Sequence, residues 1–302
     1  SMLEKRADAN ARDFINRPVL HFALMYRPHD KRLICTLLSF GADILLKDNL
    51  GMSVLHLVPN DNIPLAKILL DAKADVRSRD TYGRTPLHMH TNNEKMVKLL
   101  VRRGALVDAR DKDGATPIHH SEAITDVVTL VSCRADINAR MNVGLTHLMQ
   151  RVCRGVSIEE LDVLRECGAD MYATYHGWPL LQAAVLHGGA DAVSTLLEYG
   201  YDPFVRDENE HKTALDLVLE GRLLNSNAER DEGEHNDMDC SSASEGGSGY
   251  SEALEALVSA HCRVYTQVLT RDIPSQLSMV HSQVCRAILP MDARTDANNV
   301  DR

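Results

Sequence analysis

The chain has 302 residues, of which 44% are hydrophobic and 25% charged, a composition typical of globular proteins. Its formal net charge of −10 argues against general binding to nucleic acid or an anionic membrane, because both need a basic surface. The seven cysteines are scattered and form no Cys-x-x-Cys pair, which indicates reduced thiols in the cytoplasm or nucleus. No apolar run is long enough to cross a bilayer, so we expect no membrane insertion.

The first segment, residues 1–13, is polar and rich in helix-forming residues. We interpret it as an N-terminal cap helix, or as the end of an earlier repeat. Either interpretation places it outside the periodic region that follows.

A short phrase recurs along residues 14–224. It reads Gly-Arg-Thr-Pro-Leu-His at 83–88 and Gly-Ala-Thr-Pro-Ile-His at 114–119, with weaker copies on either side. Its apolar anchors lie 30 to 35 residues apart and are Leu20, Leu55, Leu87, Ile118, Leu148, Leu180 and Leu215. A fixed period of this length indicates a repeat architecture.

A second phrase keeps the same period, with a Leu-Leu pair followed by Gly-Ala-Asp, as at 37–43. Thr85 and Thr116 stand where an N-cap oxygen would satisfy free helical N–H groups. Pro86 and Pro117 follow at the first helical position, where a missing N–H costs nothing. The glycine of the second phrase suits the left-handed residue that ends a helix. Each repeat is therefore predicted to hold two short helices.

These two phrases resemble the ankyrin repeat, whose period is about 33 residues and whose signature is Thr-Pro-Leu-His-x-Ala. The resemblance covers about seven copies in residues 14–224. It implies an all-α solenoid of stacked helix-turn-helix units with β-turn or hairpin tips. Neighbouring units must stack, because one helix pair cannot bury its apolar face alone.

The periodicity stops in residues 225–249, which are acidic and rich in Ser and Gly. Such a composition buries too little apolar surface to offset the entropy of ordering, so we expect a disordered insertion. Ser226 and Ser242 each have Glu three residues later, which fits either an acid-directed kinase site or an inert spacer. Apolar residues at helical spacing then predict capping helices in residues 250–290, before a frayed tail at 291–302.

The histidines of the Leu-His slot invite a catalytic or metal-binding interpretation. The slot holds His21, His56, His88 and His119. The ankyrin resemblance implies that these side chains are structural and bridge neighbouring turns by hydrogen bonds. His90 and His120 lie off the slot and make a zinc site conceivable, but no complete ligand set is evident and we expect surface histidines. No metal, cofactor or catalytic residue is predicted, and the sequence contains no Gly-rich phosphate loop, Gly-x-Ser-x-Gly elbow or His-Glu-x-x-His motif.

One column of basic residues stands eight positions before four successive anchors. It consists of Lys47, Arg79, Arg110 and Arg140. Stacking would align these residues along the turn tips as a ladder that could orient an acidic peptide. The alternative is that they simply solvate the tips. Lys112 belongs to the same predicted binding surface.

Aromatic residues are a second candidate for partner contact in a chain with only 4% aromatics. Tyr82 and Tyr175 fall at turn tips, and Trp178 lies three residues after Tyr175. Exposed Tyr and Trp are favoured binding anchors. Packing between imperfect repeats is the alternative. Asn138, eight residues after Leu130, is similar to the ankyrin asparagines that a 2-oxoglutarate-dependent hydroxylase modifies.

The predicted function is a non-enzymatic, monomeric module in the cytoplasm or nucleus that binds a partner protein on its concave face. The partner segment is expected to be acidic, and no nucleic acid or cofactor is expected. One alternative is a substrate-recruiting adaptor of a ubiquitin ligase, because residues 274–289 faintly resemble the first part of a SOCS box. Another is the targeting region of a larger enzyme whose catalytic domain lies outside this sequence.

Overall fold

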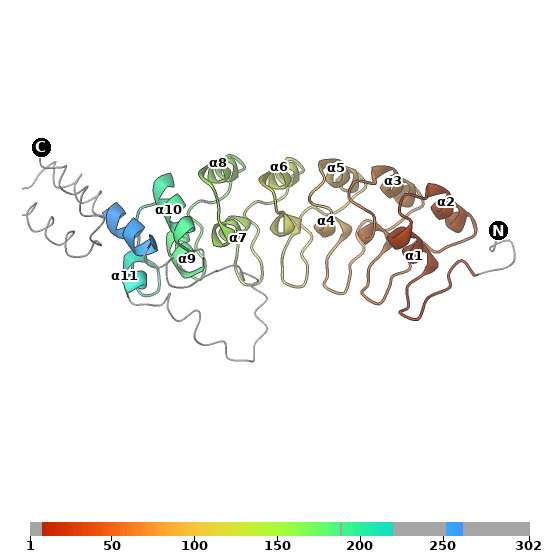
Figure 1. Ribbon diagram of the computed structural model, residues 1–302, viewed down its shortest axis with the longest axis horizontal. Helices are drawn as coiled ribbons and strands as arrows, with labels where there is room; N and C mark the ends of the chain where they lie inside the picture. Colours follow the sequence, from red (N-terminus) through yellow and green to blue (C-terminus); the bar gives the residue numbers. More distant parts are fainter. Residues whose placement is uncertain (1–7, 188, 220–251, 262–302) are drawn as a thin grey trace, which may run out of the picture. The chain divides into compact units, whose positions relative to one another are not determined.

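The computed structural model describes residues 8–187, 189–219 and 252–261 (Figure 1). Its regular elements in these ranges are all helices, and no strand is present there. The chain divides into two compact units, a first unit of residues 1–147 with 166–169 and a second unit of residues 148–165 with 170–302. The all-α prediction is therefore confirmed.

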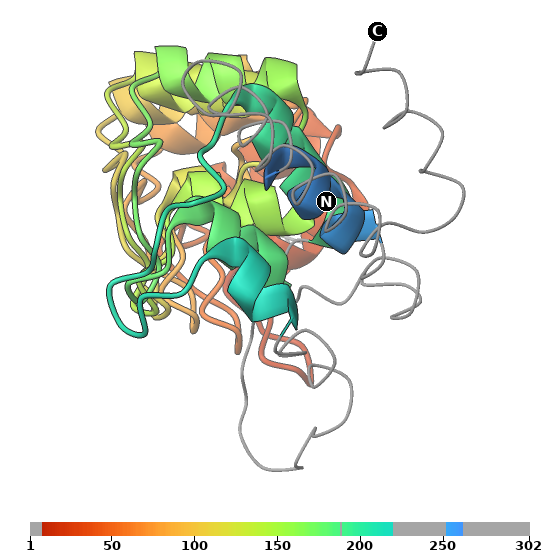
Figure 2. The ribbon, with the colours of Figure 1, turned by 90° about the vertical axis from the view of Figure 1, so that its left-hand side faces the viewer.

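The first unit is built from helix pairs that lie side by side. The pairs are α1 (Val19–Tyr26) with α2 (Lys31–Ser39), η2 (Val54–His56) with α3 (Ile63–Asp71), α4 (Pro86–Met89) with α5 (Glu94–Arg102), and η3 (Pro117–His120) with α6 (Ile124–Ser132). The first members form an inner row, in which α1 contacts η2, η2 contacts α4 and α4 contacts η3. The second members form an outer row, in which α5 lies between α3 and α6. The turns between successive pairs extend along one edge of this unit (Figures 1 and 2).

The core of the first unit is made by the two repeated phrases. The anchors Leu20, Leu55, Leu87 and Ile118 are buried, and Leu87 has no exposed surface. The second phrase contributes one buried leucine from each outer helix: Leu37, Leu69, Leu100 and Leu130. Because each anchor lies between its own pair and the next, burial depends on stacking, as in other repeat proteins.

Each outer helix ends in a residue with left-handed backbone. Gly104 has a φ of 94°, and the N–H of the next residue, Ala105, donates to the carbonyl oxygen of Leu100 at 3.0 Å. This is the C-terminal motif that favours glycine. Lys73 takes the same conformation with a φ of 73°, and Ala74 again donates to Leu69. The glycine expected here is thus favourable but not obligatory.

The turns are closed by an aspartate that folds back on its own backbone. Oδ1 of Asp80 accepts hydrogen bonds from the N–H groups of Tyr82 at 2.9 Å and Arg84 at 2.8 Å. The N–H of Asp80 donates in turn to the carbonyl oxygen of Arg84 at 2.9 Å. Aspartate favours turns for this reason, since its side chain replaces a backbone acceptor. Adjacent turns are joined by backbone hydrogen bonds, from Thr81 to Leu50 and from Lys112 to Tyr82, both at 2.9 Å.

Two inner helices of the first unit are single 3₁₀ turns. Pro59 follows η2 closely and disfavours helical backbone in the residue before it. His90 compensates, because its Nε2 lies 2.7 Å from the carbonyl oxygen of Leu55 and its Nδ1 contacts the side chain of Asn60. His90 is buried. The expectation that it is a surface histidine is therefore wrong: its ring satisfies polar groups that the shortened helix leaves free.

The second unit contains the later helices. They are α7 (His147–Arg154), α8 (Ile158–Glu166), α9 (Leu180–His187), α10 (Gly189–Tyr199), α11 (Ala214–Leu219) and a helix over residues 252–261. The first residue of α7, His147, and the last residue of α8, Glu166, belong to the first unit. In this unit α9 contacts both α10 and α11. Leu148 and Leu180 are buried as predicted, whereas Leu215 is only half-buried and Leu217 fills the core instead.

The predictions for the two ends of the chain have different outcomes. Residues 8–13 form a turn and an isolated bridge between Arg12 and Pro18, so the cap helix predicted for 1–13 is wrong over this part. The C-terminal helix predicted from 250 is present over 252–261, where Leu257 and Val258 are buried. The insertion at 225–249, the segment 262–290 and the tail at 291–302 lie outside the described residues. In the described part of the chain, no helix is long and apolar enough to cross a membrane.

Candidate protein-binding surface on the turns

The predicted basic column is a hydrogen-bonded ladder across the turns of the first unit. Nζ of Lys47 donates to the backbone carbonyl oxygen of Arg79 at 2.8 Å. Nη1 of Arg79 donates to the carbonyl oxygen of Arg110, and Nη1 of Arg110 donates to that of Arg140 at 2.8 Å. Each cation therefore binds the backbone of the next cation in the column. Their alignment, expected from the spacing, is present in the structure.

The ladder begins one repeat earlier than the sequence prediction placed it. Nη1 of Arg12 donates to the carbonyl oxygen of Lys47 at 2.9 Å, and also to that of Asn16 at 2.8 Å. Arg12 stands eight positions before Leu20, the same spacing that identified the other members. The spacing therefore identifies Arg12 as a ladder residue, whereas the cap predicted for residues 1–13 excludes it. We define the basic ladder as Arg12, Lys47, Arg79, Arg110 and Arg140.

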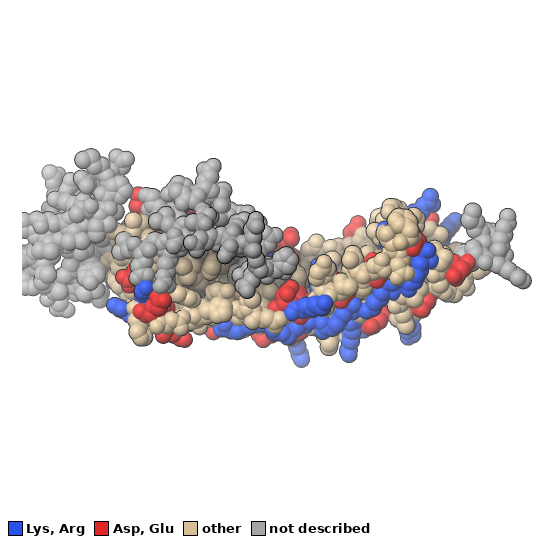
Figure 3. Space-filling view, turned by 90° about the horizontal axis from the view of Figure 1, so that it is seen from below, with Lys and Arg blue, Asp and Glu red and all other residues tan. Residues whose placement is uncertain are grey.

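The turns separate their positive and negative side chains. An aspartate follows each of the first four ladder cations, as Asp80 follows Arg79. The Asp80 side chain is fully buried, and its Oδ2 pairs with Arg84 at 2.8 Å. Arg79 and the other ladder cations are exposed. The aspartate side chains accept hydrogen bonds from the turn backbone, while the cations face outward. The outward cations give the band of Lys and Arg seen in Figure 3.

The first four cations of the ladder form no ion pair with a neighbouring acid in the part of the chain that the structure describes. Among the described residues, no carboxylate lies within ion-pair distance of Arg12, Lys47, Arg79 or Arg110. Their partners are carbonyl oxygens and the side-chain oxygen of Asn142, which carry no net charge. A row of unneutralised cations on an acidic protein can attract and orient a negatively charged partner.

Tyr82 and Lys112 join the ladder at the same edge. The Tyr82 side chain is 58% exposed, and its ring lies 4.8 Å from the guanidinium carbon of Arg84. That cation–π contact holds the ring in place while leaving one face accessible. Lys112 is exposed, and its N–H donates to the carbonyl oxygen of Tyr82. The structure therefore brings both predicted residues together with Arg79 and Arg110.

Tyr175 and Trp178 belong to the second unit and are half-buried. They pair by two backbone hydrogen bonds of 2.8 Å, and the Tyr175 ring packs edge-on against His176 and His187. The expectation that Tyr175 is an exposed tip residue is therefore wrong. Packing accounts for its ring, because a shortened turn folds it back on α9. Tyr172 is instead the exposed aromatic of this region, at 89%.

The slot histidines are structural, as predicted. The N–H of Thr85 donates to Nδ1 of His88 at 3.0 Å, so the ring proton resides on Nε2, which faces the carbonyl oxygen of Ala115 in the next repeat at 3.3 Å. His56 bonds Arg84 in the same way at 3.0 Å. Burial lowers the pKa of His88 to about 4, and the neighbouring His120 adds to the effect. These rings are neutral links between turns.

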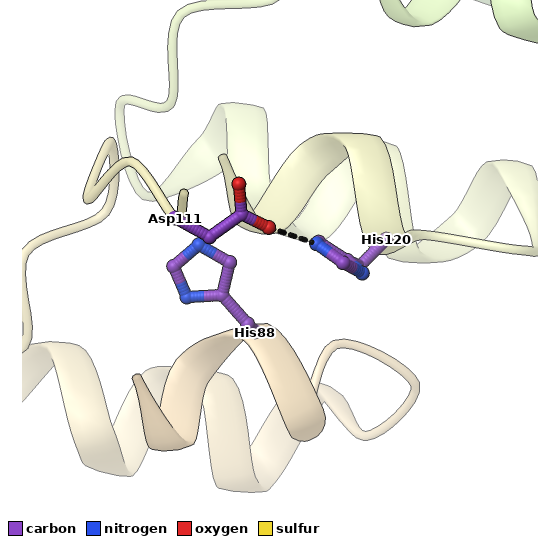
Figure 4. Close-up of side chains that lie close together, drawn as sticks. All are labelled: His88, Asp111 and His120. Atoms are coloured by element: carbon purple, nitrogen blue, oxygen red, sulfur yellow. Dashed lines mark hydrogen bonds and ion pairs between the residues drawn. The ribbon is translucent and has the colours of Figure 1, made fainter. Parts of the chain in front are cut away.

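His88, Asp111 and His120 form the only group of metal-ligand side chains found in the described part of the chain (Figure 4). Their ligand atoms lie within 4.8 Å of one another, and Nε2 of His120 is 3.0 Å from Oδ2 of Asp111. Burial alone would raise the pKa of Asp111, but hydrogen bonds from His120 and Ala115 outweigh it and lower that pKa. Both ring nitrogens of His88 already have partners. A divalent cation would have to displace the Ala115 bond, so we interpret the group as a hydrogen-bonded Asp111–His120 pair beside a structural histidine.

Of the predicted modification sites, only Asn138 lies within the described residues. Asn138 is exposed, and its Nδ2 donates to the carbonyl oxygen of Gly168 at 3.0 Å. Its side chain thus links two parts of the first unit, and its hydroxylation stays a prediction. Ser226, Ser242 and the SOCS-like segment 274–289 lie outside the described residues.

Comparison with protein families supports the interpretation drawn from the repeated phrases. The family described as ankyrin repeats matches residues 20–111 and 57–141, in three copies. These ranges contain the helix pairs from α1 to α6 and most of the basic ladder. The count of seven copies stays a prediction. The comparison with curated proteins gave no match.

Proposed function

We propose that the first unit, whose residues 20–111 and 57–141 match the ankyrin-repeat family, binds an acidic segment of a partner protein, since ankyrin repeats generally bind other proteins. The segment would lie along the turns, with its carboxylates against the basic ladder. The proposed role is recognition without chemistry, and it requires no cofactor.

One observation carries the proposal: Lys47, Arg79 and Arg110 are exposed and bonded to carbonyl oxygens, not to carboxylates. Arg79 and Arg110 keep further N–H donors for a ligand, because a guanidinium has five. The existing bonds also restrict the side chains before a partner arrives. Less conformational entropy is then lost on binding than for freely moving cations.

The packing of the first unit supports the same proposal. Neighbouring turns are joined by backbone hydrogen bonds at Leu50 and Tyr82, so the cations are held at fixed separations. A preformed row of this kind favours an extended segment whose charges recur along its length. It offers less to a compact anion, which would meet only one or two cations.

The test is affinity purification from the native cell, with partners identified by mass spectrometry. The charge-reversed variant Lys47→Glu/Arg79→Glu/Arg110→Glu is compared with the wild-type chain. Its matched control, Arg32→Glu/Lys67→Glu/Lys95→Glu, makes the same change of net charge on exposed residues of the outer helices. We expect partners with acidic segments to be lost from the ladder variant and kept by the control. Equal recovery with both variants would contradict the proposal.

A further inference from the structure

A row of exposed apolar side chains runs beside the basic ladder. Ile15, Leu50 and Tyr82 each stand five positions before an anchor and are 40%, 57% and 58% exposed. Phe14, next to Ile15, is 95% exposed. We call these four residues the apolar tip row. Single exposed apolar residues need no explanation, but a set at the same position of successive repeats marks an interaction surface.

The apolar tip row and the ladder are combined in each turn. A ladder cation precedes three of the four row members by three residues, in the pairs Arg12 with Ile15, Lys47 with Leu50, and Arg79 with Tyr82. The turns approach closely here: a Cβ on Gly51, which follows Leu50, would lie 2.9 Å from the backbone nitrogen of Thr81. Glycine at this place lets the backbones meet, and the neighbouring side chains must then project from the edge.

The turn itself does not require an apolar residue at this position. In the next repeat the position is held by Asp113, whose carbonyl oxygen accepts from Asn142 at 2.9 Å. Tyr82 makes the equivalent bond to Lys112 at the same distance. The backbone hydrogen bond between these turns therefore forms with either an acidic or an aromatic side chain at this position. The backbone bonds that join the turns therefore do not account for the exposed apolar side chains of Leu50 and Tyr82.

We infer that the partner segment carries large apolar side chains between its acidic ones. Its carboxylates meet the ladder while its apolar side chains cover Phe14, Ile15, Leu50 and Tyr82. This inference rests on the proposed function and specifies the chemistry of the ligand. Charge complementarity favours a peptide: the cations form a single line held by backbone bonds, on a chain whose net charge of −10 opposes general adsorption to an anionic bilayer.

The experiment selects random peptides from a display library on three immobilised forms of the full chain. They are the wild type, the row variant Leu50→Ser/Tyr82→Ser and the control Leu106→Ser/Val128→Ser, which removes two other exposed apolar residues, at 50% and 44% exposure. On the wild type and the control, we expect enrichment of Asp and Glu together with large apolar residues. On the row variant, acidic enrichment should persist while apolar enrichment is lost. The selected peptides should bind that variant about tenfold more weakly.

Each other outcome counts against a specific statement. Acidic peptides without apolar preference, or an apolar preference unchanged in the row variant, would overturn this inference and leave the proposed function standing. Absence of acidic enrichment on the wild type would overturn both. Sedimentation with phosphatidylserine vesicles is the parallel measurement. Vesicle binding by the wild type that the row variant loses would assign the row to a lipid surface and overturn the inference.

Discussion

Nζ of Lys47 lies 2.8 Å from the backbone carbonyl oxygen of Arg79, one repeat further along the chain. The bond uses one of the three N–H donors of the ammonium group, and its acceptor carries no net charge. It therefore positions the cation without neutralising it. The same relationship recurs from Arg79 to Arg110 and from Arg110 to Arg140, which makes the ladder a property of the stacking.

The first prediction concerns the stability of the ladder variants. Arg79→Gln/Arg110→Gln should lower the free energy of unfolding by about 1 kcal/mol or less, because exposed hydrogen bonds contribute little. Urea unfolding followed by circular dichroism measures the change. Partner recovery should fall in the same variant. A loss above about 3 kcal/mol would mean that the ladder serves folding first.

The second prediction compares two glycines with left-handed backbone. Gly114 and Gly144 have φ values of 74° and 84°, so alanine costs about 1 to 2 kcal/mol at either position. A Cβ on Gly114 would also meet the side chains of Asn142 and Arg110 and lie 2.7 Å from the Asn142 nitrogen, whereas one on Gly144 meets nothing within 4 Å.

Gly114→Ala should therefore destabilise the chain by about 3 kcal/mol and Gly144→Ala by clearly less, because only the first forces two turns apart. The unfolding midpoint in urea distinguishes them. Equal midpoints for the two variants would contradict the close packing of the turns around Gly114.

The third prediction concerns pH. The pKa of His88 falls from its ordinary value of 6.5 to about 4, chiefly through burial, so the unfolded chain takes up a proton before the folded chain does. The stability that His88 contributes is thus fully present above pH 6.5 and is lost as the pH falls towards about 4. One such ring contributes about 2 kcal/mol between about pH 7 and about pH 5.

The measurement is the free energy of unfolding in urea across that pH range. His88→Gln should show a shallower loss than the wild type, while the exposed control His29→Gln should follow the wild-type curve. A wild-type slope retained by His88→Gln would contradict the neutral, buried state of this ring.

The periodic features of the fold were predictable from the sequence because they depend on spacing. Leu87 and Ile118 are buried where the repeat places them, and Pro86 begins α4 as its missing N–H predicts. Where spacing is broken, prediction failed. Pro59 shortens η2, and the buried His90 then replaces lost backbone partners from the next repeat, a contact that no local pattern encodes.

The candidate site was predictable in position but not in electrostatics. In four of the turns an Asp directly follows the ladder Arg or Lys, an order that by itself would allow each cation to pair with its neighbour. The backbone instead turns Asp80 inward to accept hydrogen bonds from Tyr82 and Arg84, and leaves Arg79 outside. Tyr175 shows the converse error: its position in a turn suggests exposure, yet its ring packs against His187.

The most direct test of the proposed recognition is the dissociation constant of a fluorescein-labelled, glutamate-rich peptide, measured by fluorescence polarisation at about 0.05 and about 0.5 M salt. The wild-type chain should bind this probe more weakly at the higher salt, and Arg79→Glu/Arg110→Glu should bind it at least about tenfold more weakly at the lower salt. A lysine-rich probe should not bind the ladder. Equal affinity of the wild-type and charge-reversed chains for the glutamate-rich probe would contradict the account.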